Sequence, residues 1–390
     1  MPPKGQVRVR IAPSPTGHLH LGTARTALFN WLFARKHGGV FVVRIEDTDR
    51  ERSAHEYEQD IMESLKWLGL EWDEGPDRGD HGPYRQSERA LIYEKYAQKL
   101  LEEKQAYYCF CTKEELEAER QGMLSQGLPP KYSGRCRNLS SQEVQEKTNL
   151  SLSYVMRLRV PEIEVSFTDM VRGKITFDMS LAGDIPLAKA PDKPLYNLAA
   201  AIDDYEMKIS HVIRAEDHLA NTPKQILIQK ALGLPQPHYA HLPLILNPDR
   251  SKMSKRYEAT AVAEYRQAGY LPEALVNFLA FLGWHPAPEQ VSAGGLEREI
   301  ISREELTELF DLSRVQKAGA VFNIDKLGWL NAQYLKGLAT EELLKRMQAI
   351  VEVPKTLPTK KITKIVDLVK ERMKKLRDFI KEYNYKYGST

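Results

Sequence analysis

Apolar and polar positions alternate in short runs at the start of the chain. Residues 7–11 predict a strand, and the prolines within 13–17 end it because proline cannot donate a hydrogen bond to a ladder. Residues 23–36 place apolar side chains on one helix face, and the predicted helix stops at Gly38, where glycine allows a left-handed cap. Residues 40–45 predict a second strand. This βαβ spacing predicts a parallel sheet.

A similar pattern returns later in the chain. Residues 208–214 and 241–246 predict two more buried strands, and a helix between them begins at Asn221 or Thr222, with Pro223 at its first position, and ends at Gly233. The region before these strands mixes predicted helices (88–104, 142–147) with predicted strands (154–160, 175–178). That mixture indicates an insertion between two halves of one nucleotide-binding fold.

The last third of the chain is mainly helical in pattern. After a linker at about 350–360, apolar side chains keep to one face of a predicted last helix from Ile362 to Ile380. The sequence therefore predicts an α/β fold, with a Rossmann-like parallel-sheet catalytic domain split by an α+β insertion and followed by a mainly helical C-terminal region. The predicted domains are 1–80 with 191–256 (the two catalytic halves), 81–190 (the insertion), 257–320 and 321–390 (two helical parts).

The composition of the chain excludes several classes of protein but does not identify a function. With 42% hydrophobic and 28% charged residues, the 390-residue chain is typical of a globular protein. The longest mostly apolar run, 275–284, is far short of the ~20 residues that span a bilayer, so no membrane association is expected. The first residues lack the apolar stretch of a secretory signal. Three cysteines exclude a disulfide framework and favour a cytoplasmic location.

Charge is unevenly distributed along the chain. Residues 355–390 hold eleven Lys or Arg against four Asp or Glu, whereas the rest of the chain is slightly acidic. A basic segment on an acidic body indicates a polyanionic partner such as nucleic acid, although a solvated helix face has the same composition.

Two segments carry candidate chemistry, and both differ from the common GxGxxG, Walker A and HExxH patterns, which are absent from the sequence. The first, 13–23, lies where the first strand turns into its helix, and free N–H groups at a helix start suit phosphate. There Gly22 allows close approach and His20 can donate to phosphate oxygens. The second, 252–256, places three cations and a hydroxyl on one loop. Such a loop can stabilise charge on a reacting phosphate, while a plain turn and a solvated basic loop are the alternatives.

Together these segments resemble the class I aminoacyl-tRNA synthetases. Residues 20–23, His-Leu-Gly-Thr, resemble the HIGH motif with its last histidine replaced, and residues 252–256, Lys-Met-Ser-Lys-Arg, resemble the KMSKS motif. Residues 10–17, 44–50 and 212–218 narrow the resemblance to the bacterial glutamyl-tRNA synthetase family. It runs from about residue 7 to about residue 340, and it implies a chain that stops before the family's last anticodon-binding domain.

The resemblance implies a function and a set of residues. The enzyme would use ATP with Mg²⁺ to form glutamyl-AMP from L-glutamate and pass the glutamyl group to tRNA(Glu), with tRNA(Gln) as a further candidate. The insertion 81–190 would bind the acceptor stem, 257–320 would contact the tRNA stem, and 321–390 would begin the anticodon-binding region. Catalysis would rest on His20, Lys252 and Lys255. The implied ATP-binding residues are Pro13, Thr16, His20, Gly22, Thr23, Lys252, Met253, Ser254, Lys255 and Arg256, and the implied glutamate-binding residues are Arg10, Ala12, Ser14, Glu46, Tyr196 and Arg214.

The chemistry of glutamate suits these residue types. Arginine recognises a carboxylate bidentately, and Arg10 and Arg214 match the family positions for the substrate side chain, with the Tyr196 hydroxyl as a donor. Ser14 and Glu46 match positions near the amino group, which as a cation needs an anion. The alternative for the two arginines is a structural ion pair.

The cysteines suggest a structural Zn²⁺ site. Zinc prefers four ligands with thiolates among them. By resemblance, Cys109, Cys111 and Cys136 would bind it, with Tyr132 matching a tyrosine ligand of a short paralogue; the histidine that some bacterial glutamyl enzymes use is Asn138 here. The alternative is three reduced thiols packed as small hydrophobic groups.

Other functions remain in competition. A glutamyl-queuosine synthetase that modifies tRNA(Asp) shares the catalytic motifs but lacks the helical anticodon region, whose start residues 322–331 resemble. A glutaminyl enzyme usually carries Glu-Pro-Asn where this chain has Ser14-Pro15-Thr16. A tRNA-binding protein without catalysis is disfavoured by the intact His20 and Lys252. A monomer is expected.

Overall fold

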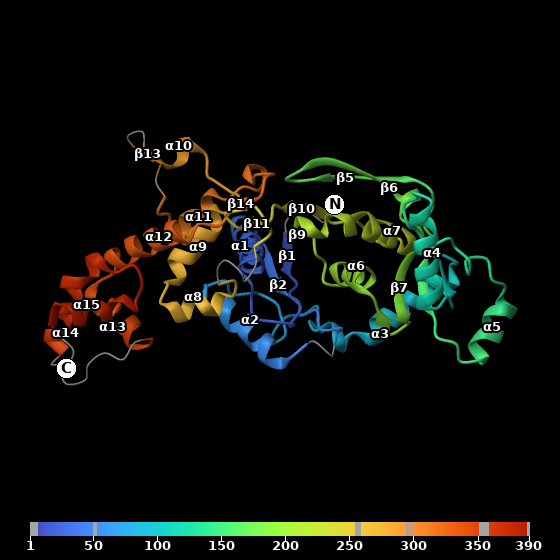
Figure 1. Cartoon of the computed structure of the whole chain (residues 1–390), viewed down its shortest axis with the longest axis horizontal. Helices are drawn as coiled ribbons and strands as arrows, with labels where there is room; N and C mark the ends of the chain where they lie inside the picture. The colour runs from blue at the N-terminus through green and yellow to red at the C-terminus, as the bar shows by residue number, and fades with distance from the viewer. Residues whose placement is uncertain are drawn as a thin grey trace. The chain divides into compact units, whose positions relative to one another are not determined.

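The computed structural model describes residues 7–49, 53–253, 259–293, 296–297, 299–350 and 359–387. These residues fold into two compact units (Figure 1). The first unit comprises Met1–Ala12, Val42–Asp49 and Glu74–His241, and the second comprises Pro13–Phe41, Arg50–Asp73 and Leu242–Thr390. Each is described by itself below.

The first unit is built on two four-stranded sheets. One has the strand order β6-β5-β10-β9, in which β5 and β10 run parallel and meet at Asp169 and Tyr239. Strand β1 lies beside β9 and also pairs with β2. The strands are β1 (Arg8–Ile11), β2 (Val40–Val43), β5 (Glu164–Asp169), β6 (Gly173–Asp178), β9 (His211–Ala215) and β10 (His238–Leu242). Parallel strands linked by helices confirm the predicted α/β fold class.

The second sheet of this unit is antiparallel, and three of its four strands lie within the predicted insertion, whereas β8 lies just after it. Its order is β3-β4-β7-β8, and each strand pairs antiparallel with the next. These strands are β3 (Ala106–Cys109), β4 (Val155–Leu158), β7 (Ile185–Ala190) and β8 (Lys193–Pro194). Because β5 and β6, from the same region, extend the sheet of β9 and β10, the inserted region and the catalytic strands share hydrogen bonds.

Helices complete the first unit. Helix α6 packs on α7 and α3, side by side in Figure 1. Their bounds are α3 (Ala90–Glu102), α4 (Lys113–Ser125), α5 (Ser141–Asn149), α6 (Tyr196–Glu206) and α7 (Thr222–Leu232), with 3-10 turns η1 (Gln86–Glu88), η2 (Met179–Leu181) and η3 (Glu216–Asn221). Helix α7 ends at Gly233, whose φ of 71° is the left-handed cap that the sequence predicts.

The second unit is mainly helical. Helix α1 contacts α9 and α11, and α9 contacts α12. The helices are α1 (Leu21–Lys36), α2 (His55–Trp67), α8 (Val262–Ala268), α9 (Pro272–Phe281), α10 (Pro288–Val291), α11 (Arg303–Leu309), α12 (Ile324–Gly337), α13 (Thr340–Gln348), α14 (Thr359–Val369) and α15 (Asp378–Tyr387), with 3-10 turns η4 (Leu312–Arg314) and η5 (Lys370–Arg372). Short strands accompany them, namely β11 (Ile245–Leu246), β12 (Ser292–Ala293), β13 (Leu296–Glu297) and β14 (Ala320–Val321). Within the described part of the chain, no helix combines the length and the apolar content that crossing a bilayer requires.

The last four helices, orange to red in Figure 1, enclose one apolar core. Its members come from α9, α12, α13, α14, α15 and the segment before α15: Leu271, Ala274, Leu335, Leu343, Leu344, Met347, Ile362, Ile365, Val366, Val369, Met373, Leu376 and Phe379. The predicted continuous helix to Ile380 is wrong, because the chain leaves the helix after Val369 and starts again at Asp378. Tertiary hydrogen bonds cause the break: the Leu376 N–H donates to the Gly269 carbonyl, and the Asp378 carboxylate accepts from Lys375.

Two other boundaries differ from the prediction for local reasons. The predicted strand 241–246 is divided into β10 and β11 at Pro243, which cannot donate to a ladder. Strand β9 begins later than residue 208, because Lys208 adopts a φ of 55° in the turn that follows α6. The linker expected at 350–360 lies mostly outside the described residues.

Candidate active site

In the first unit, Arg10 and Arg44 share one buried carboxylate. The Nε of Arg10, on β1, donates to Asp204 Oδ1 at 3.0 Å, and Arg44 Nη1 donates to the same oxygen at 2.7 Å. Burial alone would raise the pKa of Asp204, but the two guanidinium groups outweigh it and lower that pKa to about 2. Asp204, on α6, therefore stays ionised and holds both arginines in place.

Glu46 follows β2 and faces the same group of charges. Its carboxylate accepts from Arg44 Nη2 at 3.2 Å. Burial nevertheless raises the pKa of Glu46, even against the attraction of Arg44 and Arg10. A further cation that binds beside a buried carboxylate stabilises the ionised form of that carboxylate.

Arg214 is the unusual charge of this region. It lies on β9, is 5% exposed, and donates to three neutral acceptors: Nε to His241 Nε2 at 3.1 Å, Nη1 to Gln225 Oε1 at 3.0 Å and Nη2 to Thr222 Oγ1 at 2.8 Å. Among the residues that the structure describes, no carboxylate lies within ion-pair distance of its guanidinium. Burial, with Arg10 nearby, lowers the pKa of Arg214. A buried cation without a carboxylate is costly unless an anionic ligand binds it.

Tyr196 and His218 lie in the same electrostatic neighbourhood. Tyr196 is the first residue of α6, and its hydroxyl lies 3.0 Å from His218 Nδ1. Burial raises the pKa of Tyr196, and the charge of Glu46 adds to the rise. Burial and the charge of Arg214 lower the pKa of His218 to about 4. Both side chains are therefore neutral hydrogen-bonding groups at neutral pH.

Five of the six predicted glutamate-binding residues, all except Ser14, thus lie in the first unit. The charge of Arg10 acts on Glu46, Tyr196 and Arg214, and the charges of Glu46 and Arg214 act on Tyr196. Ala12 follows β1 directly. Ser14 belongs to the second unit, where it is exposed and its carbonyl accepts from the Thr16 N–H at 2.9 Å.

Several residues that shape this region are not among the predicted glutamate-binding residues. Asp203 and Asp204 were detectable as two acids after the apolar run 198–202, a pattern that indicates buried, paired carboxylates. Thr222 was expected as a cap for α7, but its hydroxyl contacts Arg214 and His241 instead. No sequence signal distinguishes His241 from the other residues of its strand.

In the second unit, His20 caps the helix that the HIGH-like motif begins. Its Nδ1 accepts from the Gly22 N–H at 3.1 Å, and this cap starts α1 two residues before the predicted position. The neighbouring Leu19 N–H donates to Asp60 at 2.9 Å. Pro13 is buried, Thr16 is exposed, and Gly22 and Thr23 are half-buried in the first turn.

The segment after the second motif pairs directly with the first. His20 forms an antiparallel bridge with Ala261, the Leu21 N–H donates to the Thr260 carbonyl at 2.8 Å, and the Val262 N–H donates to the Leu19 carbonyl at 2.9 Å. The segment that follows the second motif is therefore held beside the first motif by backbone hydrogen bonds, although the two segments are more than 200 residues apart in the sequence.

The start of the basic loop is well defined. Lys252 is exposed and bridges to Leu246, and Met253 is buried, with its N–H donating to the Ile245 carbonyl at 3.0 Å. The Asn247 side chain donates to the Lys252 carbonyl at 3.0 Å and stabilises the turn before it. The other members of this predicted set, Ser254, Lys255 and Arg256, lie outside the described residues.

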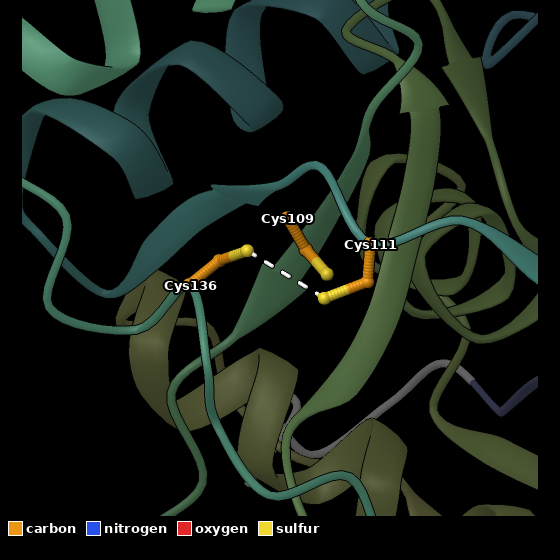
Figure 2. A group of neighbouring side chains, drawn as sticks. All are labelled: Cys109, Cys111 and Cys136. Atoms are coloured by element: carbon orange, nitrogen blue, oxygen red, sulfur yellow. Dashed lines mark hydrogen bonds between the residues drawn. The ribbon is translucent and has the colours of Figure 1, made fainter. Parts of the chain in front are cut away.

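The candidate metal ligands also come together. Cys109 ends β3, Cys111 precedes α4, and Cys136 follows α4, and their sulfur atoms lie within 4.8 Å of one another (Figure 2). Cys111 Sγ is 3.7 Å from Cys136 Sγ, and Tyr132 Oη is 3.3 Å from Cys109 Sγ and 3.6 Å from Cys111 Sγ. All three cysteines are free thiols.

The Cys111–Cys136 distance and the two distances to the Tyr132 hydroxyl match those of tetrahedral zinc. With Zn–S bonds of about 2.3 Å and Zn–O bonds of about 2.0 Å, tetrahedral ligands lie about 3.8 Å apart for two sulfurs and about 3.5 Å apart for sulfur and oxygen. Burial raises the pKa of Cys111 to about 12, and the adjacent Cys109 and Cys136 oppose its ionisation further. A cation bound among the three sulfur atoms would favour the thiolate form of Cys111. The Arg157 guanidinium, 4.1 Å from the centre of the Tyr132 ring, offers a positive charge beside the cluster.

A parallel-sheet α/β fold that is split by an insertion, with a histidine-capped His-x-Gly helix start bonded to the segment that follows the basic loop, defines a class I aminoacyl-tRNA synthetase. The family model for the catalytic domain of class I tRNA synthetases (E and Q) matches residues 6–329. The chain belongs to this glutamyl and glutaminyl family.

Similar proteins of other organisms agree with this assignment. The chain is 48% identical to a glutamate–tRNA ligase of Natranaerobius thermophilus, over 98% of this chain and 79% of that protein. It is 50% identical to a glutamate–tRNA ligase of Carboxydothermus hydrogenoformans, over 94% of this chain and 76% of that protein. It also resembles a crystal structure of a glutamate tRNA ligase from Elizabethkingia meningosepticum in complex with its amino acid, with a TM-score of 0.87, 38% identity and coverage of 98% and 79% of the two chains.

Proposed function

We propose that this chain is an ATP-dependent ligase that joins L-glutamate to tRNA(Glu). The observation that carries the proposal is Arg214, a buried guanidinium whose protein partners are all neutral. With Arg10 and Tyr196 in the same neighbourhood, it suits an anionic substrate side chain. The names of the relatives support glutamate as that substrate.

The bound amino acid would be oriented by opposite charges. The γ-carboxylate would accept hydrogen bonds from Arg214 and Arg10, with the Tyr196 hydroxyl as a further donor. The α-amino group would lie near Glu46, whose pKa is raised by burial, so that a bound cation would stabilise the ionised carboxylate. Ala12 and Ser14 complete this proposed set, and Ser14 would contribute its hydroxyl to the amino group.

Two steps would follow. An oxygen of the α-carboxylate forms a bond to the α-phosphorus of ATP, the bond to the β-phosphate oxygen breaks, and pyrophosphate leaves with that electron pair. A hydroxyl of the terminal adenosine of tRNA then attacks the acyl carbon, loses its proton, and displaces AMP. Because the protein adds no covalent chemistry, its contribution is positioning and charge stabilisation.

ATP would bind in the second unit. We assign this role to Pro13, Thr16, His20, Gly22, Thr23, Lys252, Met253, Ser254, Lys255 and Arg256. His20 would donate from Nε2 to phosphate, since its Nδ1 already accepts the Gly22 N–H. Lys252 and Lys255 would stabilise charge on the phosphates as pyrophosphate leaves, and Mg²⁺ would bind those same phosphates.

A structural zinc would hold the inserted region. Cys109, Cys111, Cys136 and Tyr132 have the spacing for it, and across residues 111–150, all of which the structure describes, no side chain is buried. A bound ion would supply the cross-link that an apolar core provides elsewhere. The proposed domain functions are acceptor-stem binding for 81–190, stem contact for 257–320 and anticodon-arm binding from 321 onward.

The test is aminoacylation with purified components. Radiolabelled glutamate, ATP and tRNA(Glu), tRNA(Gln) or tRNA(Asp) are incubated side by side, and ATP–pyrophosphate exchange is followed with and without tRNA. We expect glutamate-dependent exchange and charging of tRNA(Glu). Charging of tRNA(Asp) alone would support the queuosine-modifying alternative, and tRNA binding without exchange would support a non-catalytic protein. We further propose a monomer acting in the cytoplasm, and light scattering tests the oligomeric state.

A further inference from the structure

Arg214 is held by a chain of hydrogen bonds that reaches into the inserted region. Strand β5 runs parallel to β10, and its last residue, Asp169, is paired with Tyr239. Asp169 Oδ2 lies 2.6 Å from His241 Nδ1, and His241 Nε2 accepts from Arg214 Nε at 3.1 Å. The side chains of Asp169 and His241 are 0% exposed.

We propose that Asp169 and His241 are positioning residues for Arg214 and thereby for selection of glutamate. The inference rests on the proposed function, because it assigns Arg214 to the substrate side chain. Neither residue belongs to the set that the sequence motifs indicate, and neither would touch the substrate.

The partners of Asp169 fix the tautomer of His241. The Asp169 carboxylate also accepts the backbone N–H groups of Val171, Arg172 and His241, at 3.0, 2.9 and 3.1 Å. These donors and His241 outweigh the effect of burial and lower the pKa of Asp169, which stays an acceptor. His241 must then carry its proton on Nδ1, which leaves the Nε2 lone pair facing Arg214.

A neutral His241 is required at this position. Burial lowers its pKa, and Arg214 opposes a second proton, because a protonated Nε2 would direct an N–H at the guanidinium N–H. The Thr222 hydroxyl completes the arrangement: it accepts from Arg214 Nη2 at 2.8 Å, and its oxygen lies 3.0 Å from His241 Nε2. Every contact that orients the guanidinium is thus made by a neutral group.

This arrangement orients the Arg214 guanidinium without neutralising its charge. A carboxylate bonded directly to Arg214 would compete with the substrate for its charge, whereas Asp169 is kept one imidazole ring away. Of the five N–H donors of an arginine, three are used here, and one on each terminal nitrogen remains to face a ligand carboxylate. The pair therefore fixes the plane in which a bidentate contact can form.

Asp169→Asn tests the proposal in the whole enzyme. The oxygen of the new amide can accept the Val171 and Arg172 N–H groups only if the amide NH₂ faces His241. His241 then carries its proton on Nε2 instead of Nδ1, so it no longer offers a hydrogen-bond acceptor to Arg214. We expect kcat/KM for glutamate in tRNA-dependent pyrophosphate exchange to fall about 10–10³-fold, mainly through KM for glutamate. KM for ATP should stay unchanged, and the preference for glutamate over glutamine should narrow.

Asp184→Asn is the matched control. Asp184 is equally charged, is 4% exposed, lies in the same inserted region, and accepts from a backbone N–H and from the Tyr107 hydroxyl. Thermal unfolding of both variants corrects for lost stability. If Asp169→Asn retains the wild-type KM for glutamate, or if Asp184→Asn narrows the glutamate preference equally, the positioning role is refuted.

A second pair of variants remains informative if Asp169→Asn folds poorly. His241→Gln can still offer an oxygen to Arg214 Nε, whereas His241→Phe offers none. We expect the glutamine variant to retain several-fold higher kcat/KM for glutamate than the phenylalanine variant, and equal losses would overturn the proposal. Absence of glutamate activation in the wild-type enzyme would instead overturn the proposed function, and this inference with it.

Discussion

Replacing Arg214 is the most direct test of how this enzyme would recognise glutamate. The side chain is buried, yet it contacts only the neutral acceptors His241, Gln225 and Thr222. Its removal therefore leaves no buried carboxylate without a partner. We expect Arg214→Ala to fold and to lose activity, whereas a structural arginine would show the reverse pattern.

The magnitude follows from the two N–H donors that remain for a ligand. A hydrogen bond to a charged group contributes about 1.5–3 kcal/mol, so a bidentate contact contributes about 3–6 kcal/mol. At about 1.4 kcal/mol per factor of ten, kcat/KM for glutamate should fall about 10²–10⁴-fold. Glutamine carries no charge at this position and should lose less, so the ratio of the two kcat/KM values should shrink. Arg214→Lys restores charge without the planar fork and should recover only part of the loss.

Stability should respond weakly to the same change. The three hydrogen bonds that the charged guanidinium donates contribute about 1.5–3 kcal/mol each. Removing Arg214 also removes the cost of burying a cation without a carboxylate, which offsets their loss. We expect the melting temperature of Arg214→Ala to stay within a few degrees of the wild type. Arg78→Ala is a suitable control, because its guanidinium is largely exposed and pairs with the neighbouring Asp77.

The assay is tRNA-dependent pyrophosphate exchange, run to saturation with glutamate and with glutamine for each variant. Differential scanning fluorimetry on the same samples reports folding. If Arg214→Ala keeps full preference for glutamate and a normal KM, Arg214 is structural and the side-chain pocket lies elsewhere.

Three further outcomes follow from the described geometry. Asp204→Ala should lower the free energy of unfolding by about 3–5 kcal/mol in urea titration, because it leaves two buried guanidinium groups without their shared carboxylate; a loss below about 1 kcal/mol would contradict this. Purified protein should contain one zinc per chain by metal analysis, and Cys136→Ser or a chelator should expose residues 111–150 to proteolysis; a metal-free protein that resists the protease equally would rule the site out. Burial opposes the ionisation of Glu74, but the Arg8 fork and the Tyr84 hydroxyl lower its pKa from 4.5 to about 2, so this contribution to stability is present above pH 4.5 and is lost as the pH falls toward 2. The unfolding free energy of Glu74→Gln should therefore fall less steeply across that window than that of the wild type, and parallel curves would contradict the assignment.

Local patterns predicted the framework of this protein well. The strand at 7–11, the helix ended by Gly38 and the helix from Thr222 to Gly233 are present, because each depends on nearby residues: an alternating run, a glycine cap or a proline at the first helical position. The motif residues of 10–23 and 212–218 likewise indicated the family by resemblance, because each motif is a short run of neighbouring residues that can be read in the sequence.

Features that depend on distant segments were not predictable in this way. The apolar positions between Ile362 and Ile380 were predicted correctly, but the helix that they suggested is broken. Between Val369 and Asp378 the chain packs into the apolar core and donates a hydrogen bond to the Gly269 carbonyl. Likewise, the apolar pattern predicted a buried strand at 241–246. It could not predict that β10 pairs with β5, because that pairing depends on the tertiary fold.

The candidate site likewise has features that the sequence predicts and features that depend on the tertiary structure. The sequence by itself determined the residue types, two arginines, a tyrosine and a glutamate for a charged amino acid, because motif positions encode chemistry directly. Only the tertiary structure decided which arginine is neutralised and which is not. Arg10 shares Asp204 from a helix almost 200 residues away, whereas Arg214 is given a neutral histidine whose tautomer is fixed by Asp169 from another strand. Charge compensation depends on which groups approach within a few ångströms, and that proximity is created by chain folding rather than by sequence neighbours.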